Sequence, residues 1–165
     1  GEPLPLAHMA LPGAGLPDPR RGLPIRDYLA ACRASALAFM ESAPLEGCRD
    51  LVVLGTEECM YPALVLGRLL EERGHRVRCH ATTRSPIGIC DAPDYPITAG
   101  GKIRSFYQPG RETYLYDMAP CDALVVVSDT LSQDKGPLAD IAALWGRDGW
   151  KKLFYMQGGR DVWYI

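Results

Sequence analysis

The segment 82–88 carries the side chains of this chain best suited to binding an anion. It reads Thr-Thr-Arg-Ser-Pro-Ile-Gly, which places the guanidinium of Arg84 among three hydroxyls, those of Thr82, Thr83 and Ser85. Such a set can hold phosphate or carboxylate oxygens through charge-assisted hydrogen bonds. Hydroxyl residues before a proline are also common in turns, where they bind their own backbone. The pattern therefore favours either a ligand-binding loop or an ordinary turn.

A second polar segment, Gly-Thr-Glu-Glu-Cys at 55–59, joins an expected strand to an expected helix. Backbone N–H groups and the helix dipole normally favour an anion at such a place. Glu57 and Glu58 would repel a phosphate there, so the site beside Thr56 is better suited to a cationic group or a metal ion. Alternatively, the two glutamates simply cap the helix, since acidic residues are common in a first helical turn.

A third polar segment, 128–136, follows the most strand-like run of the chain, Ala-Leu-Val-Val-Val at 123–127. It opens with hydroxyls and a carboxylate, on Ser128, Asp129, Thr130 and Ser132. A sugar phosphate could bind here, with the carboxylate on ribose hydroxyls or on Mg²⁺ and the hydroxyls and amides on phosphate. The alternative is a local turn that leads into the next helix.

Lys102 follows two glycines and is a further candidate ligand of an anion. On a mobile flap it could close over a bound phosphate, but on an ordinary strand it would only meet solvent. The three histidines, His8, His75 and His80, show no metal-ligand spacing and no Ser/His/Asp or Cys/His arrangement. The sequence therefore identifies candidate ligand-binding residues and no catalytic group.

Alternating helical and strand patterns must position these segments. Apolar residues at helical spacing predict helices, and short runs of β-branched residues predict strands. In chain order we expect a helix at 25–41, a strand at 51–55, a helix at 61–73, a strand at 75–81, a hairpin of strands at 103–107 and 113–116, a strand at 123–127, a helix at 137–145 and a strand at 151–156. This order predicts an α/β fold: an open, mostly parallel sheet flanked by helices, with a β-hairpin flap. Ligands of such sheets bind outside the carboxyl ends of the strands, where all three polar segments fall.

Residues 1–24 differ in composition from the rest of the chain. They are dense in proline and glycine, which disfavour both helices and strand ladders. We expect an arm or linker at 1–24 and one domain at 25–165, because a chain of 165 residues with 47% hydrophobic content can build a single core. The chain begins with Gly1 and not with Met, which suggests a segment of a longer protein with an N-terminal neighbour.

Charge and cysteine content argue against several classes of protein. The formal net charge of -2, without a basic run, provides no attraction for a polyanion such as nucleic acid. The six cysteines never form a C-x-x-C pair, which fits neither a zinc site nor a disulfide framework and favours a reduced, cytoplasmic protein. No apolar stretch is long enough to span a membrane, and none follows a basic start. We therefore expect a cytoplasmic protein that binds neither nucleic acid nor a membrane.

The run Thr83-Arg84-Ser85-Pro86 resembles the signature of the TRSP domain family. Further stretches that resemble the family lie at 55–58, 60–61, 95–97, 105–107 and 113–116, so the resemblance covers most of 25–165. It implies a phosphoribosyltransferase-like, Rossmann-like fold and a place C-terminal to a phosphoribosyltransferase domain in the same longer chain. It also implies a bacterial operon of the tellurite-resistance or stress-response type and a part in making a nucleoside-like metabolite.

The segment 124–136 also resembles the phosphoribosyl diphosphate loop of type I phosphoribosyltransferases, in which a hydrophobic strand leads to two acidic residues and a phosphate cradle. In this chain Ser128 stands in place of the first acidic residue, and Gln133-Asp134-Lys135 stands where the family has small residues. The resemblance implies a phosphoribosyl ligand and would bring Mg²⁺ as its cofactor.

Two functions stay open, and whether the protein is an enzyme stays open with them. A ligand-binding domain would hold a phosphoribosyl, nucleotide or nucleoside-like molecule at 82–86 and 128–132, with Arg84 and Asp129 as leading contacts. Transferase chemistry there would rest on orienting the ribosyl donor and stabilising the departing diphosphate. A non-catalytic module would instead dock on a partner phosphoribosyltransferase domain through the arm and exposed aromatic residues, with Tyr107, Tyr114, Tyr116, Trp163 and Tyr164 as candidates.

Overall fold

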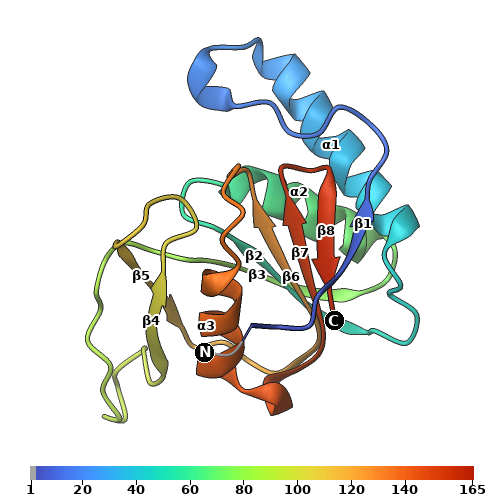
Figure 1. The fold of residues 1–165 in the computed structure, drawn as a ribbon. Coiled ribbons are helices and arrows are strands. Elements are labelled where there is room, and N and C mark those ends of the chain that lie inside the picture. The colour runs from blue at the N-terminus through green and yellow to red at the C-terminus, as the bar shows by residue number, and fades with distance from the viewer. Residues whose placement is uncertain (1–2) are drawn as a thin grey trace.

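A six-stranded sheet forms the centre of the protein (Figure 1). The computed structural model describes residues 3–165, except for the side chain of Arg147. The strands lie in the order β1-β8-β7-β6-β2-β3, and their bounds are β1 Ala7–Ala10, β2 Asp50–Gly55, β3 Arg76–Ala81, β6 Cys121–Ser128, β7 Trp150–Gln157 and β8 Asp161–Tyr164. Strands β3, β2, β6 and β7 run parallel, whereas β8 is antiparallel to both of its neighbours, β7 and β1. The sheet is therefore mixed.

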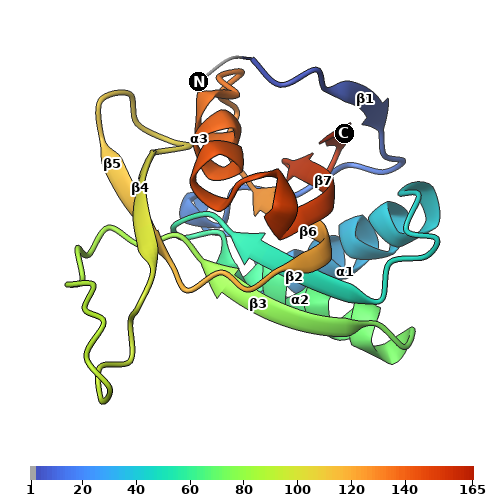
Figure 2. The ribbon, with the colours of Figure 1, turned by 90° about the horizontal axis from the view of Figure 1, so that it is seen from below.

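Different elements cover the two faces of the sheet (Figure 2). They are the helices α1 (Ile25–Ser42), α2 (Met60–Glu72) and α3 (Gly136–Trp145) and the hairpin of β4 (Gly100–Arg104) and β5 (Glu112–Tyr116). Helices α1 and α2 pack on one face, and α3 packs with the hairpin on the other. No helix among residues 3–165 is both long and apolar enough to cross a membrane.

The central strands are apolar along their whole length because both of their faces are covered. On β2, Leu51 and Val53 face α1 and α2, whereas Val52 and Leu54 face α3 and the hairpin, and all four are fully buried. Strand β6 repeats this alternation. A continuous apolar run is typical of a strand between two layers. This is why runs of apolar residues, without polar alternation, identified β2 and β6.

The parallel strands bring the three polar segments to one edge of the sheet, their carboxyl edge. The backbone N–H of Thr82 donates to Gly55 at 3.0 Å, and that of Thr56 donates to Val127 at 3.1 Å, so the loops after β3, β2 and β6 start side by side. An isolated bridge between Thr83 and Tyr114 joins the hairpin to the same edge. The fold thus assembles segments that lie far apart in the sequence.

The α/β class is confirmed, but several expectations need correction. The sheet is mixed and not mostly parallel, because the chain turns back after β7 through Gly158 and Gly159, whose φ angles are 59° and 65°, and adds the unexpected strand β8. The expectation that residues 1–24 form no ladder is wrong for Ala7–Ala10, a stretch without proline or glycine that pairs with β8. The first hairpin strand is Gly100–Arg104, not 103–107, since the chain bends at Ser105 toward the carboxyl edge.

The sheet has two open edges, β3 and β1. On β3, Arg76 pairs with Asp50 at 2.6 Å, and Arg78 donates to the carbonyl of Pro120 at 2.6 Å. Strand β1 has four residues. One edge strand is therefore basic and the other is short.

Asp122 fastens the amino end of β6 to that of β2. Its Oδ2 accepts hydrogen bonds from the backbone N–H groups of Arg49 at 2.8 Å and Asp50 at 2.9 Å, and its Oδ1 accepts one from Lys151 at 2.6 Å. The Asp50 amide, followed by Lys151 and the Arg49 amide, holds the pKa of Asp122 well below its ordinary value. The ionised carboxylate therefore helps to fix the alignment of the strands that end at the carboxyl edge.

Replacing Asp122 by asparagine should lower the free energy of unfolding at pH 7 by about 1 kcal/mol, because hydrogen bonds to a charged acceptor become weaker ones. A carboxyl group with a depressed pKa in the folded state stabilises the protein above its unfolded-state pKa, and this contribution is lost as the pH falls toward the folded-state pKa. The difference between the two proteins should therefore be full above about pH 5 and shrink below about pH 4. Urea unfolding at pH 7 and at acid pH measures it; a difference that does not change with pH would contradict the assignment.

Candidate functional site

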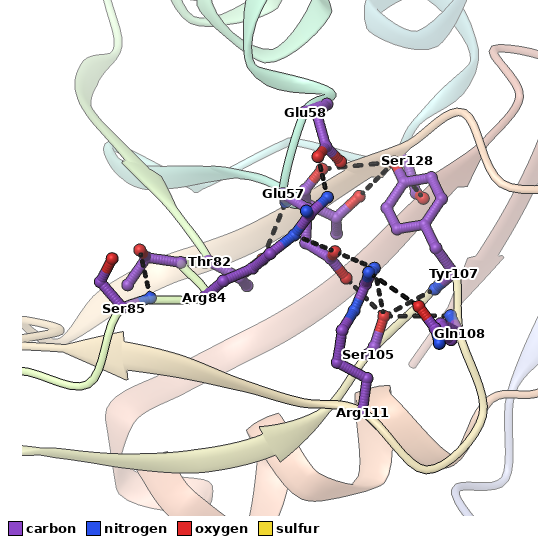
Figure 3. Close-up of polar contacts among 12 residues, drawn as sticks. Glu57, Glu58, Thr82, Arg84, Ser85, Ser105, Tyr107, Gln108, Arg111 and Ser128 are labelled. Carbon is purple, nitrogen blue, oxygen red and sulfur yellow. Dashed lines mark hydrogen bonds and ion pairs between the residues drawn. The ribbon is translucent and has the colours of Figure 1, made fainter.

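The carboxylate of Glu57 lies buried at the carboxyl edge, with its side chain 1% exposed (Figure 3). The hydroxyl of Ser105 donates to Oε1 at 2.5 Å, while Arg111 and, at 3.4 Å, Arg84 donate to Oε2. The backbone N–H of Glu57 donates to the hydroxyl of Thr82 at 2.9 Å. Loops from β2, β3 and the hairpin turn therefore converge on one residue.

The backbone of Glu57 is left-handed, with a φ angle of 48°. For a residue other than glycine this conformation costs on the order of 1–2 kcal/mol and persists only where the surroundings hold it. Here, the hydrogen bond that the N–H group of Glu57 donates and those that its two carboxylate oxygens accept hold this conformation. The contacts of the carboxylate therefore offset a strained backbone as well as the burial of a charge.

Arg84 links this buried centre to the surface. It also pairs with Glu58, and the side chains of Arg84 and Glu58 are 52% and 58% exposed. Arg111 closes the buried side and is 26% exposed, with an Nε atom that has no hydrogen-bond partner among residues 3–165. Two guanidinium groups balance two carboxylates, so the cluster has no net charge. An incoming phosphate would have to compete with Glu57 and Glu58 for Arg84.

Asp129 forms a second centre, next to the end of β6. The phenol of Tyr107 donates to its Oδ1 at 2.6 Å, and a guanidinium nitrogen of Arg20 lies 3.4 Å from its Oδ2. The same phenol oxygen lies 3.0 Å from the hydroxyl of Thr56 and 3.3 Å from that of Ser128. Burial, above all, raises the pKa of Tyr107 well above its ordinary value, so the phenol stays a donor. Tyr107 thus fixes the orientation of the Asp129 carboxylate.

Alternate side chains of the loop 128–136 bind the backbone two residues further on. The acceptor oxygens belong to Ser128, Thr130, Ser132 and Asp134, and the bonds are 2.8–3.3 Å long. The turn interpretation is therefore right for the hydroxyls of this loop. Asp129 lies between two members of the series and binds Tyr107 and Arg20 instead.

A cavity of about 250 Å³ adjoins Asp129. Gln157 holds one of its walls, because its side-chain amide donates to the carbonyls of Thr130 at 3.2 Å and Ser132 at 2.6 Å. The cavity is lined by Ala14, Leu16, Asp129, Thr130, Leu131, Gln133, Gln157, Gly158, Arg160 and Asp161. Its volume lies below the about 300–1,000 Å³ of typical pockets for drug-sized ligands.

The structure brings most of the candidate residues together and leaves a few apart. The first centre contains Thr82, Arg84, Glu57 and Glu58, and the second contains Thr56, Ser128 and Asp129. The hydroxyl of Thr83 accepts the N–H of Ser85 at 3.1 Å, as in an ordinary turn. Lys102 is 61% exposed and pairs with Glu112 across the hairpin at 2.9 Å, so it does not join either centre.

The two glutamates do not cap α2, contrary to one of the two interpretations of the sequence. The residue before the helix, Cys59, makes no side-chain capping bond, and the first helical turn carries no acidic residue. Glu57 and Glu58 bind cationic groups instead, and these groups are arginines of the chain itself. No set of three or more His, Cys, Asp or Glu side chains within 3–165 could hold a metal ion.

Sequence reasoning missed the contributions of Arg20, Ser105, Arg111 and Gln157 to these centres. Arg111 follows Gly110 in the hairpin turn, next to the proposed flap, and a flap that reaches a ligand site has its turn residues closest to that site. This signal could have found Arg111. Arg20 lies in the arm, and its contact with Asp129 depends on the path of that arm across the domain.

The fold and the two centres define an α/β domain whose parallel strands end in a charge-balanced polar site closed by a hairpin. The chain belongs to the TRSP family: residues 25–143 match the family model described as the TRSP domain C terminus to PRTase_2, a phosphoribosyltransferase domain. Comparison with curated proteins and with solved structures yields no match. The family run at 83–86 lies in the first centre, where Arg84 pairs with both glutamates.

Replacing Glu57 by glutamine should lower the free energy of unfolding by about 3 kcal/mol, because two guanidinium groups lose a buried counter-charge. The matched change Glu58→Gln removes an exposed partner of Arg84 and should cost at most about 1 kcal/mol. Chemical denaturation of both variants at neutral pH measures the two losses. Equal losses would contradict the central position of Glu57.

Proposed function

We propose that this TRSP domain binds a phosphoribosyl, nucleotide or nucleoside-like ligand at the carboxyl edge of its sheet, in association with a phosphoribosyltransferase domain. The observation that carries the proposal is the placement of Asp129, which lines the 250 Å³ cavity while Tyr107 holds its carboxylate. A carboxylate accepts hydrogen bonds only, and ribose hydroxyls donate them. The cavity therefore suits the sugar of such a ligand.

Arginine side chains near the cavity favour a ligand with an anionic group. Arg160 lines the cavity, and Arg84 is half-exposed at the neighbouring centre. Because Glu57 and Glu58 already neutralise Arg84, a phosphate would gain from Arg84 only by taking over one of these contacts. A phosphate on the sugar would thus meet Arg160, which lines the cavity. Mg²⁺ commonly binds one or two protein carboxylates together with phosphates and water, and Asp129 could supply that carboxylate.

Family membership supports the remaining parts of the proposal. The family description places a TRSP domain after a phosphoribosyltransferase domain. This favours a phosphoribosyltransferase-like origin of the fold and a part in making a nucleoside-like metabolite in bacterial tellurite or stress resistance. If the domain takes part in the transfer step, its residues would orient the ribosyl donor and stabilise the departing diphosphate.

A second candidate function is docking on the partner domain without ligand binding. Its support is a group of exposed apolar side chains on α1 and α2, namely Ile25, Leu29, Met60, Tyr61 and Leu64, which are 38–70% exposed. Two of the aromatic residues that the sequence suggested for docking are less suitable. Tyr107 belongs to the candidate site, and Tyr164 stacks on Phe154 with ring centres 6.2 Å apart. A docking surface would therefore lie on the helices.

Ligand binding should raise the thermal midpoint of the protein, because a ligand stabilises the state that binds it. We expect a shift with phosphoribosyl diphosphate and a smaller one with ribose 5-phosphate, in a screen that includes diphosphate and nucleosides with and without Mg²⁺. Asp129→Asn should reduce both shifts, and Arg84→Ala should weaken the phosphorylated ligands by about three- to tenfold. Arg68→Ala, which removes an 81% exposed arginine on α2, is the matched control and should change neither shift.

If Asp129→Asn leaves the thermal shifts unchanged, the ligand binds at a site other than the cavity beside Asp129. If no compound shifts the midpoint, ligand binding by this domain is contradicted and docking is favoured. In that case Leu64→Asp should weaken association with the partner phosphoribosyltransferase domain, which can be measured by size-exclusion chromatography.

A further inference from the structure

A second groove, of about 420 Å³, lies at the open end of the hairpin. The turn of the hairpin reaches the carboxyl edge. The groove lies at the other end of the hairpin, where Gly100 pairs with Tyr116, and the rise per residue of a strand places this pair about 14 Å from Arg104. Its lining consists of Ile89, Thr98, Ala99, Gly100, Leu115, Asp117, Met118, Leu144 and Trp145. Among the described side chains of this lining, that of Asp117 is the one that carries a charge. Volume and apolar walls resemble those of small-molecule pockets.

Asp117 is held in a fixed position at this groove. Its backbone is left-handed, with a φ angle of 44°, and its N–H donates to the carbonyl of Ala99 at 3.0 Å. Its Oδ1 accepts hydrogen bonds from the N–H of Ala99 at 2.9 Å and from the N–H and hydroxyl of Thr98 at 3.2 and 3.3 Å. The carboxylate is thus oriented by its neighbours before any ligand arrives.

Asp117 is also a half-buried carboxylate, and no basic side chain pairs with it among those that the structure describes, which do not include that of Arg147. Every other side-chain carboxylate among residues 3–165 that is buried or half-buried contacts an Arg, Lys or His: Asp18, Asp50, Glu57, Asp122, Asp129, Asp140 and Asp161. The charge of Asp117 favours the protonated form of His80, but burial, and next to it the charge of Arg78, outweigh this effect and lower the pKa of the imidazole. His80 is therefore a poor counter-charge for Asp117. A charge that is partly removed from water is stabilised by an opposite charge.

The apolar walls of the groove are formed in advance. Leu144, on the last turn of α3, rests on Gly101 of the hairpin, where any Cβ atom would collide with it. The indole of Trp145 packs over Gly149 in the same way. Leu144 and Ile89 are 40% and 47% exposed at the groove, and Leu115, at 1%, is buried. Apolar surface of this kind remains open to a ligand.

We infer that this groove binds a small organic cation, such as an amidine or a protonated amine attached to a flat apolar ring. The cationic group donates hydrogen bonds to Asp117, and the ring lies among Ile89, Leu144 and Trp145. This site is separate from the carboxyl-edge site and takes a ligand of opposite charge. The inference therefore does not rest on the proposed function.

An NMR titration of the ¹⁵N-labelled protein with benzamidine tests the inference, with benzoate as a probe of the same shape and opposite charge. Benzamidine should shift the amide signals of Thr98 and Asp117 and the indole signal of Trp145 in a saturable way, and benzoate should not. Asp117→Asn should weaken benzamidine at least tenfold. Asparagine suits the left-handed backbone, and its oxygen can still accept from Thr98 and Ala99. Glu46→Gln, at an exposed carboxylate in the loop after α1, should leave binding unchanged.

The inference is overturned by any of three results: equal binding of benzoate, an unchanged benzamidine affinity in Asp117→Asn, or no saturable shift at these signals. If the amide spectrum shows that Asp117→Asn does not fold, the comparison of the two probes on the unmodified protein decides. Leu144→Ala then serves as the second variant and should weaken benzamidine several-fold, because it removes part of the apolar wall.

Discussion

The buried carboxylate of Glu57 is the interaction on which the candidate site depends. Its contacts join three separate parts of the chain: the loop after β2, the loop after β3 through Thr82 and Arg84, and the hairpin turn through Ser105 and Arg111. A buried charge is costly when it lacks a partner, whereas this carboxylate has several donors. The hairpin is therefore tied to the sheet by a polar contact as well as by the apolar core beneath it.

This arrangement explains why phosphate-binding residue types need not make a phosphate site. Arg84 lies in a loop at the end of a parallel strand, where anions often bind, but Glu57 and Glu58 occupy its donors. The carboxylate of Glu57 takes the place that an anionic ligand would take. Asp129 also contacts an arginine, Arg20 at 3.4 Å, but it lines a cavity that a ligand can enter. The two centres thus differ in how much binding capacity they retain.

The central elements could be predicted from the sequence because their patterns are local. Continuous apolar runs identified β2 and β6, and helical spacing identified α1 and α2. Strands β1 and β8 were missed because both are short and their pairing, of β8 with β7 and of β1 with β8, joins them only in the folded sheet. The alignment of polar loops at one edge followed from the parallel order of the strands. The pairing of Arg84 and Arg111 with Glu57 could not be predicted, because it depends on how far the hairpin folds over the edge.

The open edges of the sheet have a consequence for the behaviour of the protein at high concentration. An edge strand exposes unpaired N–H and C=O groups to which a strand of another molecule can add. On β3, Arg76 and Arg78 place positive charges beside these groups, and a second β3 would bring like charges together. Strand β1 offers only four residues for pairing. Edge-to-edge aggregation is thereby disfavoured at both ends of the sheet.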